Sequence, residues 1–284
     1  MKTYDSATAA LNLLRTILDE GAEVPFHVGD LIRAASPEQV NFLILGALRT
    51  REECPALEGV AAAWLQTRSD HIKTLLAVAT DAGIQSPIRL RCWRLARGAQ
   101  AFENRHFIEE AAVRLLADPC EPLRLSATEV ASHAYWSGKA MSAEAERLMR
   151  DPSPRVRAAS CGLVRSSLGT EQLEPLLDDP EPEVRIEAIR WMLSGTLTIV
   201  LHGRHKPTRE NRAAAAAARD LLDRMCAVLT QVVEAQYPDP LRVSAIDLLG
   251  RSFGNYAAAT RTLRCLAEND SSLEIRAAAV ACAA

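Results

Sequence analysis

Two histidine-containing segments come nearest to metal chemistry in their residue types and spacing. His202 and His205 stand in "HGRH", which supplies half of a metal site, but no Cys, Asp or Glu accompanies them at ligand spacing. His106 and Glu109 stand in "HFIEE", where the spacing i, i+3 places both on one helix face, as in di-iron bundles. No second Glu-x-x-His follows in the chain. We therefore predict no metal site and no cofactor.

The sequence also offers no catalytic constellation. It has neither a P-loop nor a G-x-G-x-x-G dinucleotide fingerprint. The tryptophans fall in expected helices, where packing in the core is favoured over a base-stacking platform. We predict that the protein is not an enzyme.

One basic run has the chemistry of phosphate binding. Arg89, Arg91, Arg94 and Arg97 lie within nine residues of one another. Binding a nucleic-acid backbone requires a positive stripe that continues along the protein, and the chain as a whole has a net charge of −3. Whether the run continues depends on the elements that carry it.

Composition places these residues in an ordinary soluble chain. Of its 284 residues, 48% are hydrophobic and 24% are charged. The longest apolar runs are far shorter than the roughly 20 residues that span a bilayer, and no secretion signal opens the sequence. The seven cysteines are odd in number and never form a C-x-x-C pair, which favours free thiols in a reducing compartment. We expect a cytoplasmic protein that does not associate with membranes.

A repeated turn and helix organise the chain. Six copies have an Arg preceded by an aliphatic residue and followed, three positions later, by a small residue, and four of them have Asp six positions before the Arg. Neighbouring copies are 28 to 35 residues apart except for one interval of 57, which suits a helix-turn-helix unit with one insertion. The arginines are Arg89, Arg124, Arg157, Arg185, Arg242 and Arg276.

The physics of one copy, "DPSPRVR", explains why the turn is repeated. Pro152 disfavours helical backbone at Asp151 and so ends the preceding helix. Ser153 is expected to cap the next helix, and Pro154 suits its first position because the missing N–H is not needed there. The aliphatic residues of the helix then form one buried stripe, which leads us to expect an all-α fold.

The pattern D-P-x-x-x-V-R-x-x-A resembles the HEAT-repeat family, most closely the short HEAT-like repeats of the phycobilin-lyase type. The resemblance covers roughly residues 84 to 284 and implies an α–α superhelix, a helical-repeat solenoid. It also implies that Asp and Arg of successive turns form a ladder, a structural set comprising Asp118, Arg124, Asp151, Arg157, Asp179, Arg185, Asp270 and Arg276.

We expect a single helical-repeat domain over residues 1–284. It comprises divergent N-terminal helices at 1–83, regular repeats at 84–194, a loop insertion at 195–211 and C-terminal repeats at 212–284. Helices are expected at 170–178, 182–194 and 212–236, among others, with none between residues 21 and 36. The loop explains the long interval between copies, and insertions in repeat arrays often form part of a binding face.

Stacked repeats without catalytic residues favour a scaffold or adaptor that binds another protein, including one that it inhibits or neutralises. The identity of that partner stays open. Two alternatives rest on the resemblance: a nucleic-acid-binding protein similar to the alkylpurine DNA glycosylases, and a bilin-lyase-like accessory protein. Against the first, the positions equivalent to Arg91 and Arg94 in later copies carry mixed charges. The candidate partner-binding residues are Arg91, Arg94, Arg97, His202, Arg204, His205, Lys206 and Arg209.

Overall fold

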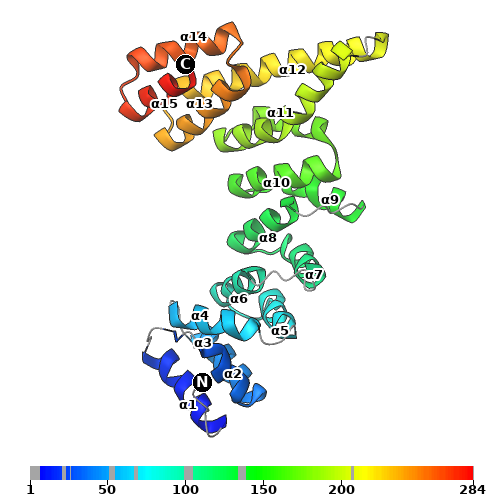
Figure 1. Cartoon of the computed structure of the whole chain (residues 1–284). Coiled ribbons are helices and arrows are strands. Elements are labelled where there is room, and N and C mark those ends of the chain that lie inside the picture. Colours follow the sequence, from blue (N-terminus) through cyan, green and yellow to red (C-terminus); the bar gives the residue numbers. More distant parts are fainter. Residues whose placement is uncertain are drawn as a thin grey trace. The chain divides into compact units, whose positions relative to one another are not determined.

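The expected all-α class is confirmed by a computed structural model of the chain (Figure 1), whose described residues form helices and no strand. The described residues are 7–20, 24–25, 27–50, 55–66, 70–98, 105–133, 139–205 and 208–283. None of the helices in these ranges combines the length and apolar character needed to cross a bilayer. Contacts divide the chain into two compact units, unit 1 at residues 1–127 and unit 2 at 128–284.

Unit 1 is built from short helices. Large apolar side chains, among them Leu14, Trp64 and Trp93, are fully buried in it. His71 is also buried, with its ring stacked on that of Trp64 at a centroid distance of 4.2 Å. The helices are α1 (Ala7–Glu20), α2 (Val28–Ala34), α3 (Pro37–Thr50), α4 (Pro55–Leu65), α5 (Asp70–Thr80), α6 (Ser86–Gly98), α7 (Arg105–Leu115) and α8 (Glu121–His133), which continues into unit 2.

Unit 2 comprises α9 (Lys139–Leu148), α10 (Pro154–Ser167), the 3₁₀ helix η2 (Thr170–Asp178), α11 (Pro182–His205), α12 (Arg209–Glu234), α13 (Asp239–Phe253), α14 (Ala257–Asn269) and α15 (Leu273–Ala283). Helices α10, α11, α13 and α15 pack on one another in that order and are called layer A. Each of η2, α12 and α14 packs on two consecutive helices of layer A. The repeated sequence unit therefore corresponds to a repeated packing unit here.

The turns before four of the repeated helices are closed by an aspartate side chain. A serine caps one of these helices, α15, where Oγ of Ser272 accepts the Ile275 N–H at 3.4 Å. Pro154 stands in the first turn of α10 as expected, but Ser153 makes no side-chain cap hydrogen bond. Instead, Oδ1 of Asp151 accepts the backbone N–H of Ser153 at 2.9 Å. Asp118, Asp179 and Asp270 accept the backbone N–H two residues further on in the same way. A carboxylate suits the Asp position because it accepts several hydrogen bonds at once.

The expected loop at 195–211 is wrong, because α11 continues through Gly195 to His205. The 3₁₀ helix η2 lies so close that a Cβ on Gly195 would stand 3.0 Å from Oγ1 of Thr170. Thr196 is buried, and its hydroxyl donates to the carbonyl oxygen of Met192 at 3.0 Å. Packing thus stabilises a helix through residues whose own preference is for other structures.

Three other expectations also differ from the structure. Helix α12 begins at Arg209 because Thr208 caps it, accepting the Asn211 N–H at 3.1 Å. Segment 170–178 is a 3₁₀ helix rather than an α-helix and contains Pro175, which has no backbone N–H to donate. Helix α2, which lies in the range where none was expected, is only seven residues long.

Candidate functional site

The ladder of Asp and Arg is a set of contacts between consecutive turns. In unit 2, Arg157 donates through Nη1 to the carbonyl oxygen of Asp151 in its own turn at 2.9 Å. The same guanidinium forms a bidentate pair with Asp179 in the next turn, at 2.8 Å from Nε and 2.9 Å from Nη2. One side chain thereby ties two turns together.

The contact with the residue's own turn recurs along the chain. Arg124, Arg185 and Arg276 donate to the carbonyl oxygens of Asp118, Asp179 and Asp270 respectively, at 2.6–2.8 Å. Beyond its own turn, Arg185 meets the hydroxyl of Tyr237, with Nη2 at 3.4 Å from it. The next turn, after the 57-residue interval, has no Asp six residues before its Arg, and the hydroxyl of Tyr237 meets Arg185 in place of a carboxylate.

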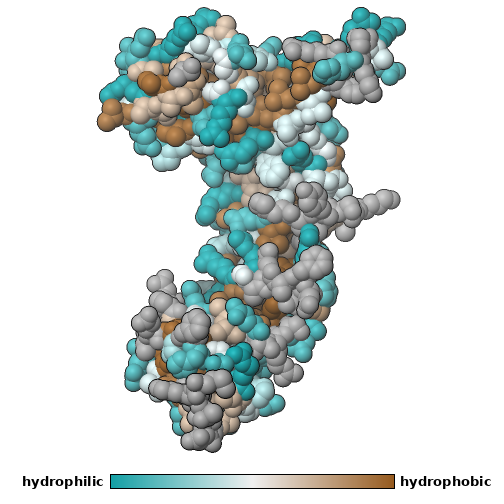
Figure 2. All heavy atoms as spheres, viewed as in Figure 1, coloured by the Kyte–Doolittle hydropathy of each residue, from teal (hydrophilic) through white to brown (hydrophobic). Residues whose placement is uncertain are grey.

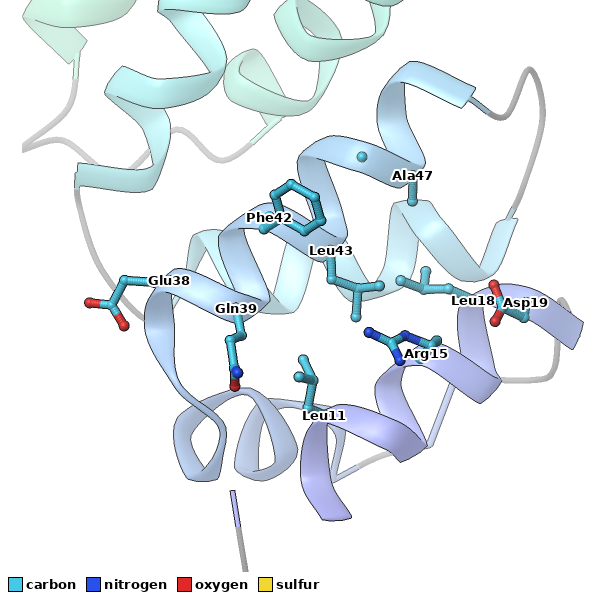
Figure 3. A pocket seen from close by; sticks show the side chains of 10 residues that line it. Leu11, Arg15, Leu18, Asp19, Glu38, Gln39, Phe42, Leu43 and Ala47 are labelled. Atoms are coloured by element: carbon cyan, nitrogen blue, oxygen red, sulfur yellow. The ribbon is translucent and has the colours of Figure 1, made fainter. Parts of the chain in front are cut away.

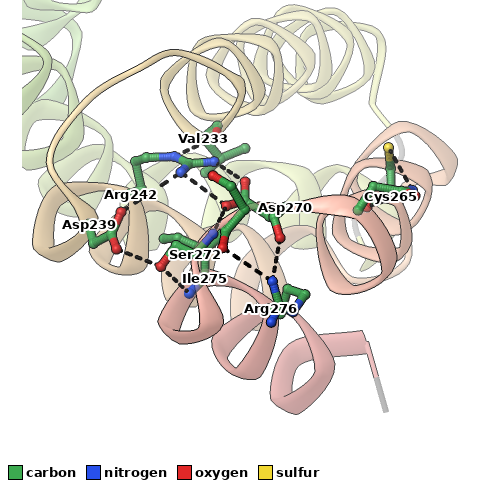
Figure 4. A network of polar contacts seen from close by, with 10 residues as sticks. Val233, Asp239, Arg242, Cys265, Asp270, Ser272, Ile275 and Arg276 are labelled. Atoms are coloured by element: carbon green, nitrogen blue, oxygen red, sulfur yellow. Dashed lines mark hydrogen bonds and ion pairs between the residues drawn. The ribbon is translucent and has the colours of Figure 1, made fainter.

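Two arginines that the predicted ladder set did not include also belong to the ladder. Arg89 stands at its start, and Arg242 stands where it resumes after the 57-residue interval. Arg89 and Arg242 have no Asp six residues before them. Each instead donates through Nε, at 2.9 Å, to a carbonyl oxygen of the preceding helix, that of Ala79 or of Val233. Each also forms an ion pair with the Asp of the next turn. Arg89 pairs with Asp118, and Figure 4 shows the pair of Arg242 with Asp270. In the sequence, the absence of an Asp six residues before the Arg is the signal that the Arg donates to the preceding helix instead of to its own turn.

The electrostatics of the ladder favour the charged forms. The hydrogen bond from Arg242 holds the pKa of Asp270 below its ordinary value, although partial desolvation opposes this. Burial of Asp179 also opposes ionisation, but its hydrogen bonds from Arg157 and the Glu181 N–H outweigh burial and lower its pKa. The hydrogen bond with Asp179 raises the pKa of Arg157 in turn. These groups are therefore engaged in contacts within and between the turns.

Two of the three candidate arginines on α6 are also engaged within the protein. Arg91 donates to the carbonyl oxygen of Leu48 at 3.4 Å, and Arg97 donates to Oγ of Ser126 at 3.0 Å. The same hydroxyl accepts the indole N–H of Trp93 at 3.0 Å. Arg94 is exposed. The structure therefore does not bring the three guanidinium groups together as a free basic surface.

The other candidate residues lie where α11 ends and α12 begins. His205 and Arg209 are exposed, whereas Lys206 and the side chains of His202 and Arg204 lie outside the described part of the chain. The apolar run "LTIVL", residues 197–201, lies on α11 of this helical hairpin and exposes Leu197, Ile199 and Leu201. In Figure 1, α11 and α12 lie side by side and extend beyond the other helices of unit 2, and Figure 2 shows hydrophobic residues along α12.

Layer A carries a closely packed aromatic contact. A Cβ on Gly162 of α10 would stand 2.9 Å from Cζ2 of Trp191 on α11, so the indole packs directly on the glycine. The guanidinium of Arg165 lies 5.7 Å from the centre of the indole ring. Beside it, Arg190 pairs with Glu187 at 2.8 Å and donates to Oγ of Ser244 at 3.0 Å. Trp191 thus serves packing between repeats.

One segment matches the sequence motif of the nucleophile elbow of hydrolases but does not have the structure of that motif. "GRSFG", residues 250–254, fits G-x-S-x-G, whose serine must stand on a sharp turn between a strand and a helix. Ser252 is the last residue but one of α13, so it follows a helix rather than a strand. The described residues contain no strand that could present it.

An apolar groove of about 590 Å³ lies between α1 and α3 in unit 1. Figure 3 shows Leu11 and Leu18 from α1, and Leu43 and Ala47 from α3, along this space. The edges are polar and charged, with Arg15, Asp19, Glu38 and Gln39. Phe42, another lining residue, is 83% exposed.

An exposed phenylalanine beside an apolar groove calls for a binding explanation. Scattered surface leucines are ordinary in soluble proteins, but an aromatic side chain next to a concave apolar floor is typical of an interaction site. Sequence reasoning missed the groove because its two walls lie about 27 residues apart in a region without the repeat pattern. Only their packing brings Leu11 and Leu43 to one surface.

No family model matches the chain, and the curated proteins contain no match to it. Among solved structures, the chain is similar to a crystal structure of an engineered protein from a structural genomics consortium, with a TM-score of 0.44 and 15% identity. That match covers 99% of this chain and 75% of the other chain.

Proposed function

We propose that the chain is a non-enzymatic, cytoplasmic scaffold of the HEAT-like repeat type, an α–α solenoid, which binds a partner protein in the α1–α3 groove. The observation that carries this proposal is the apolar groove beside the exposed ring of Phe42. An aromatic side chain of this kind contributes a large apolar area at little conformational cost when a partner covers it.

The dimensions of the groove favour an amphipathic helix as its occupant. From Leu11 to Asp19, α1 supplies a wall about 12 Å long, and α3 supplies about 13 Å from Glu38 to Ala47. This length accommodates two to three turns, with apolar side chains at i, i+3 or i+4, and i+7. Because two acids, Asp19 and Glu38, stand on the edges against one cation, Arg15, we expect Lys or Arg beside the apolar stripe of the partner helix.

The contacts of α6 favour protein over nucleic acid as the partner. Arg91 and Arg97 already donate to Leu48 and Ser126. A phosphate backbone would have to compete with these hydrogen bonds, and only Arg94 of the three is exposed.

Closing the groove with a single side chain tests the proposal. A Cβ on Gly46, which lines the groove, would meet no heavy atom within 4 Å, so Gly46→Leu should occupy the groove without disturbing the fold. Protein captured from the source cell is identified by mass spectrometry, purified, and titrated against the wild type and the variant by calorimetry. We expect Gly46→Leu to weaken binding at least roughly tenfold.

Gly98 supplies the matched control. It also has open space around an added Cβ, but it ends α6 and does not line the groove. Gly98→Leu should therefore bind like the wild type. Equal affinity of wild type and Gly46→Leu would exclude the groove as the binding site, and failure to retain any protein would count against the scaffold function itself.

A further inference from the structure

Glycines inside the helices mark where a neighbouring side chain packs closely. Apart from proline, glycine is the least favourable residue in a helix interior, so its presence there calls for a packing reason. In four described helices, an added Cβ on the glycine would stand 3.0 Å or less from a heavy atom of another segment. These glycines are Gly59, Gly162, Gly195 and Gly250, which meet Val24, Trp191, Thr170 and Cys282 respectively. Each of them gives room to a side chain of that segment.

Gly46 also stands inside a helix, α3, but the space beside it is open. An added Cβ there would meet no described heavy atom within 4 Å. Gly46 lines the groove between α1 and α3. Gly98 has similar space around it, but it ends α6, and glycine is common at helix ends. Packing within the described chain therefore does not require glycine at position 46, whereas a side chain of the groove's occupant would.

Phe42 and Gly46 give this side of α3 a protrusion and a hollow. They are four residues apart, about one turn or 6 Å along the helix, so they lie on the same side of it. Phe42 is 83% exposed, and Gly46 has no side chain. Leu43, three residues before Gly46, extends into the groove beside them (Figure 3). A helix that packs along this surface must match both features, because the core of an interface packs as densely as a protein interior.

We propose that the hollow at Gly46 receives a large apolar side chain, Leu or Phe, of the partner helix, and that a small residue three or four positions away faces Phe42. This inference rests on the proposed function and adds the size pattern by which the groove selects its partner. The ring of Phe42 holds the backbone of the partner helix away from α3, so a side chain rather than the backbone must fill the hollow. That side chain is the anchor of the complex, since large buried side chains near the centre of an interface contribute most to affinity.

A peptide selection tests the size pattern with a defined probe. The probe is a phage-displayed library of helical peptides about 16 residues long, or four turns, with a lysine-rich polar face. The positions of its apolar stripe vary among Gly, Ala, Leu and Phe. Selection on the full wild-type chain should enrich a large and a small residue three or four positions apart. In calorimetric titrations, Gly46→Leu should bind the enriched peptide roughly tenfold more weakly than the wild type, and the control Gly98→Leu should bind it equally.

Exchanging the sizes is the decisive measurement. A peptide with Ala in place of its large residue should bind the wild type roughly tenfold more weakly than the enriched peptide does. The same Ala peptide should bind Gly46→Leu more tightly than the enriched peptide does, because the new leucine fills the hollow from the side of α3. Phe42→Ala, at an exposed position, provides a second exchange. A peptide with Leu in place of its small residue should prefer Phe42→Ala, whereas the wild type should prefer the enriched peptide.

The outcomes separate the size pattern from the groove itself. Circular dichroism establishes that each variant is folded. If neither variant inverts its preference, the size pattern is wrong, although weaker binding of the enriched peptide to Gly46→Leu would still support the groove as the binding site. If the wild type enriches no peptide, or if Gly46→Leu binds the enriched peptide as the wild type does, both the size pattern and the groove are wrong.

Discussion

The ladder between turns and the exposed surface of helix α13 both pair Arg with Asp, but in different ways. In the ladder, Arg89 and Asp118 are 4% and 6% exposed and join one turn to the next. On α13 of layer A, Arg251 and Asp247 are 78% and 49% exposed and pair within a single helix at 2.7 Å. The ladder therefore links repeats, whereas the pair on layer A links only neighbouring turns of one helix.

Sequence distance explains this difference. An Arg and an Asp four residues apart on a helix meet at the surface and stabilise it by a few tenths of a kcal/mol, because water screens them. An Arg whose partner stands in the next turn, 22 to 29 residues away, must cross the contact between repeats and loses its water there. Such pairs contribute little net stability when intact but are costly to break one partner at a time.

The largest expected effect comes from removing one ladder partner. Asp118→Ala leaves the guanidinium of Arg89 buried without its counter-ion, and we expect unit 1 to lose about 3 to 5 kcal/mol. Urea unfolding followed by circular dichroism measures the change. Asp247→Ala on layer A serves as the control and should cost about 0.5 kcal/mol or less. Similar losses for both variants would contradict the distinction between the two regions.

The ladder was accessible from sequence because its residues recur at fixed spacing. The pattern D-P-x-x-x-V-R contains both groups that Arg157 contacts, its own Asp151 and the next Asp179. The helix beyond Gly195 was not accessible, because its local preference opposes helix and only packing against η2 decides the outcome. The groove was inaccessible for a related reason, since Leu11 and Leu43 share no motif and meet only through tertiary packing.

A second, intermediate effect concerns the acid stability of unit 2. Because the pKa of Asp270 is lowered in the folded chain, chiefly by the hydrogen bond from Arg242, its contribution is present above the ordinary aspartate value of about 3.9. That contribution is lost as the pH falls through the folded pKa. We expect Asp270→Asn to cost about 1 to 2 kcal/mol at pH 7. Thermal melts should show this cost shrinking below about pH 4, and a cost independent of pH would show that the charge on Asp270 is not what stabilises the turn.

The smallest expected effect has the opposite sign and lies on layer A. Burial raises the pKa of Glu187 above its ordinary value, and the nearby charge of Arg190 does not fully compensate. A raised folded pKa means that the stabilising contribution is present below the ordinary glutamate value, about 4.3, and is lost as the pH rises through the folded pKa. At pH 7, therefore, the ionised side chain is a slight liability in the folded state. The neutral side chain of Glu187→Gln should stabilise the chain at pH 7 by at most about 0.5 kcal/mol, with no gain near pH 4.

The control is Glu146→Gln on α9, which removes an exposed charge and should change the melting temperature equally little at both pH values. If Glu187→Gln instead melted lower than the wild type at pH 7, the Arg190 pair would be stabilising, and this part of layer A would resemble the ladder.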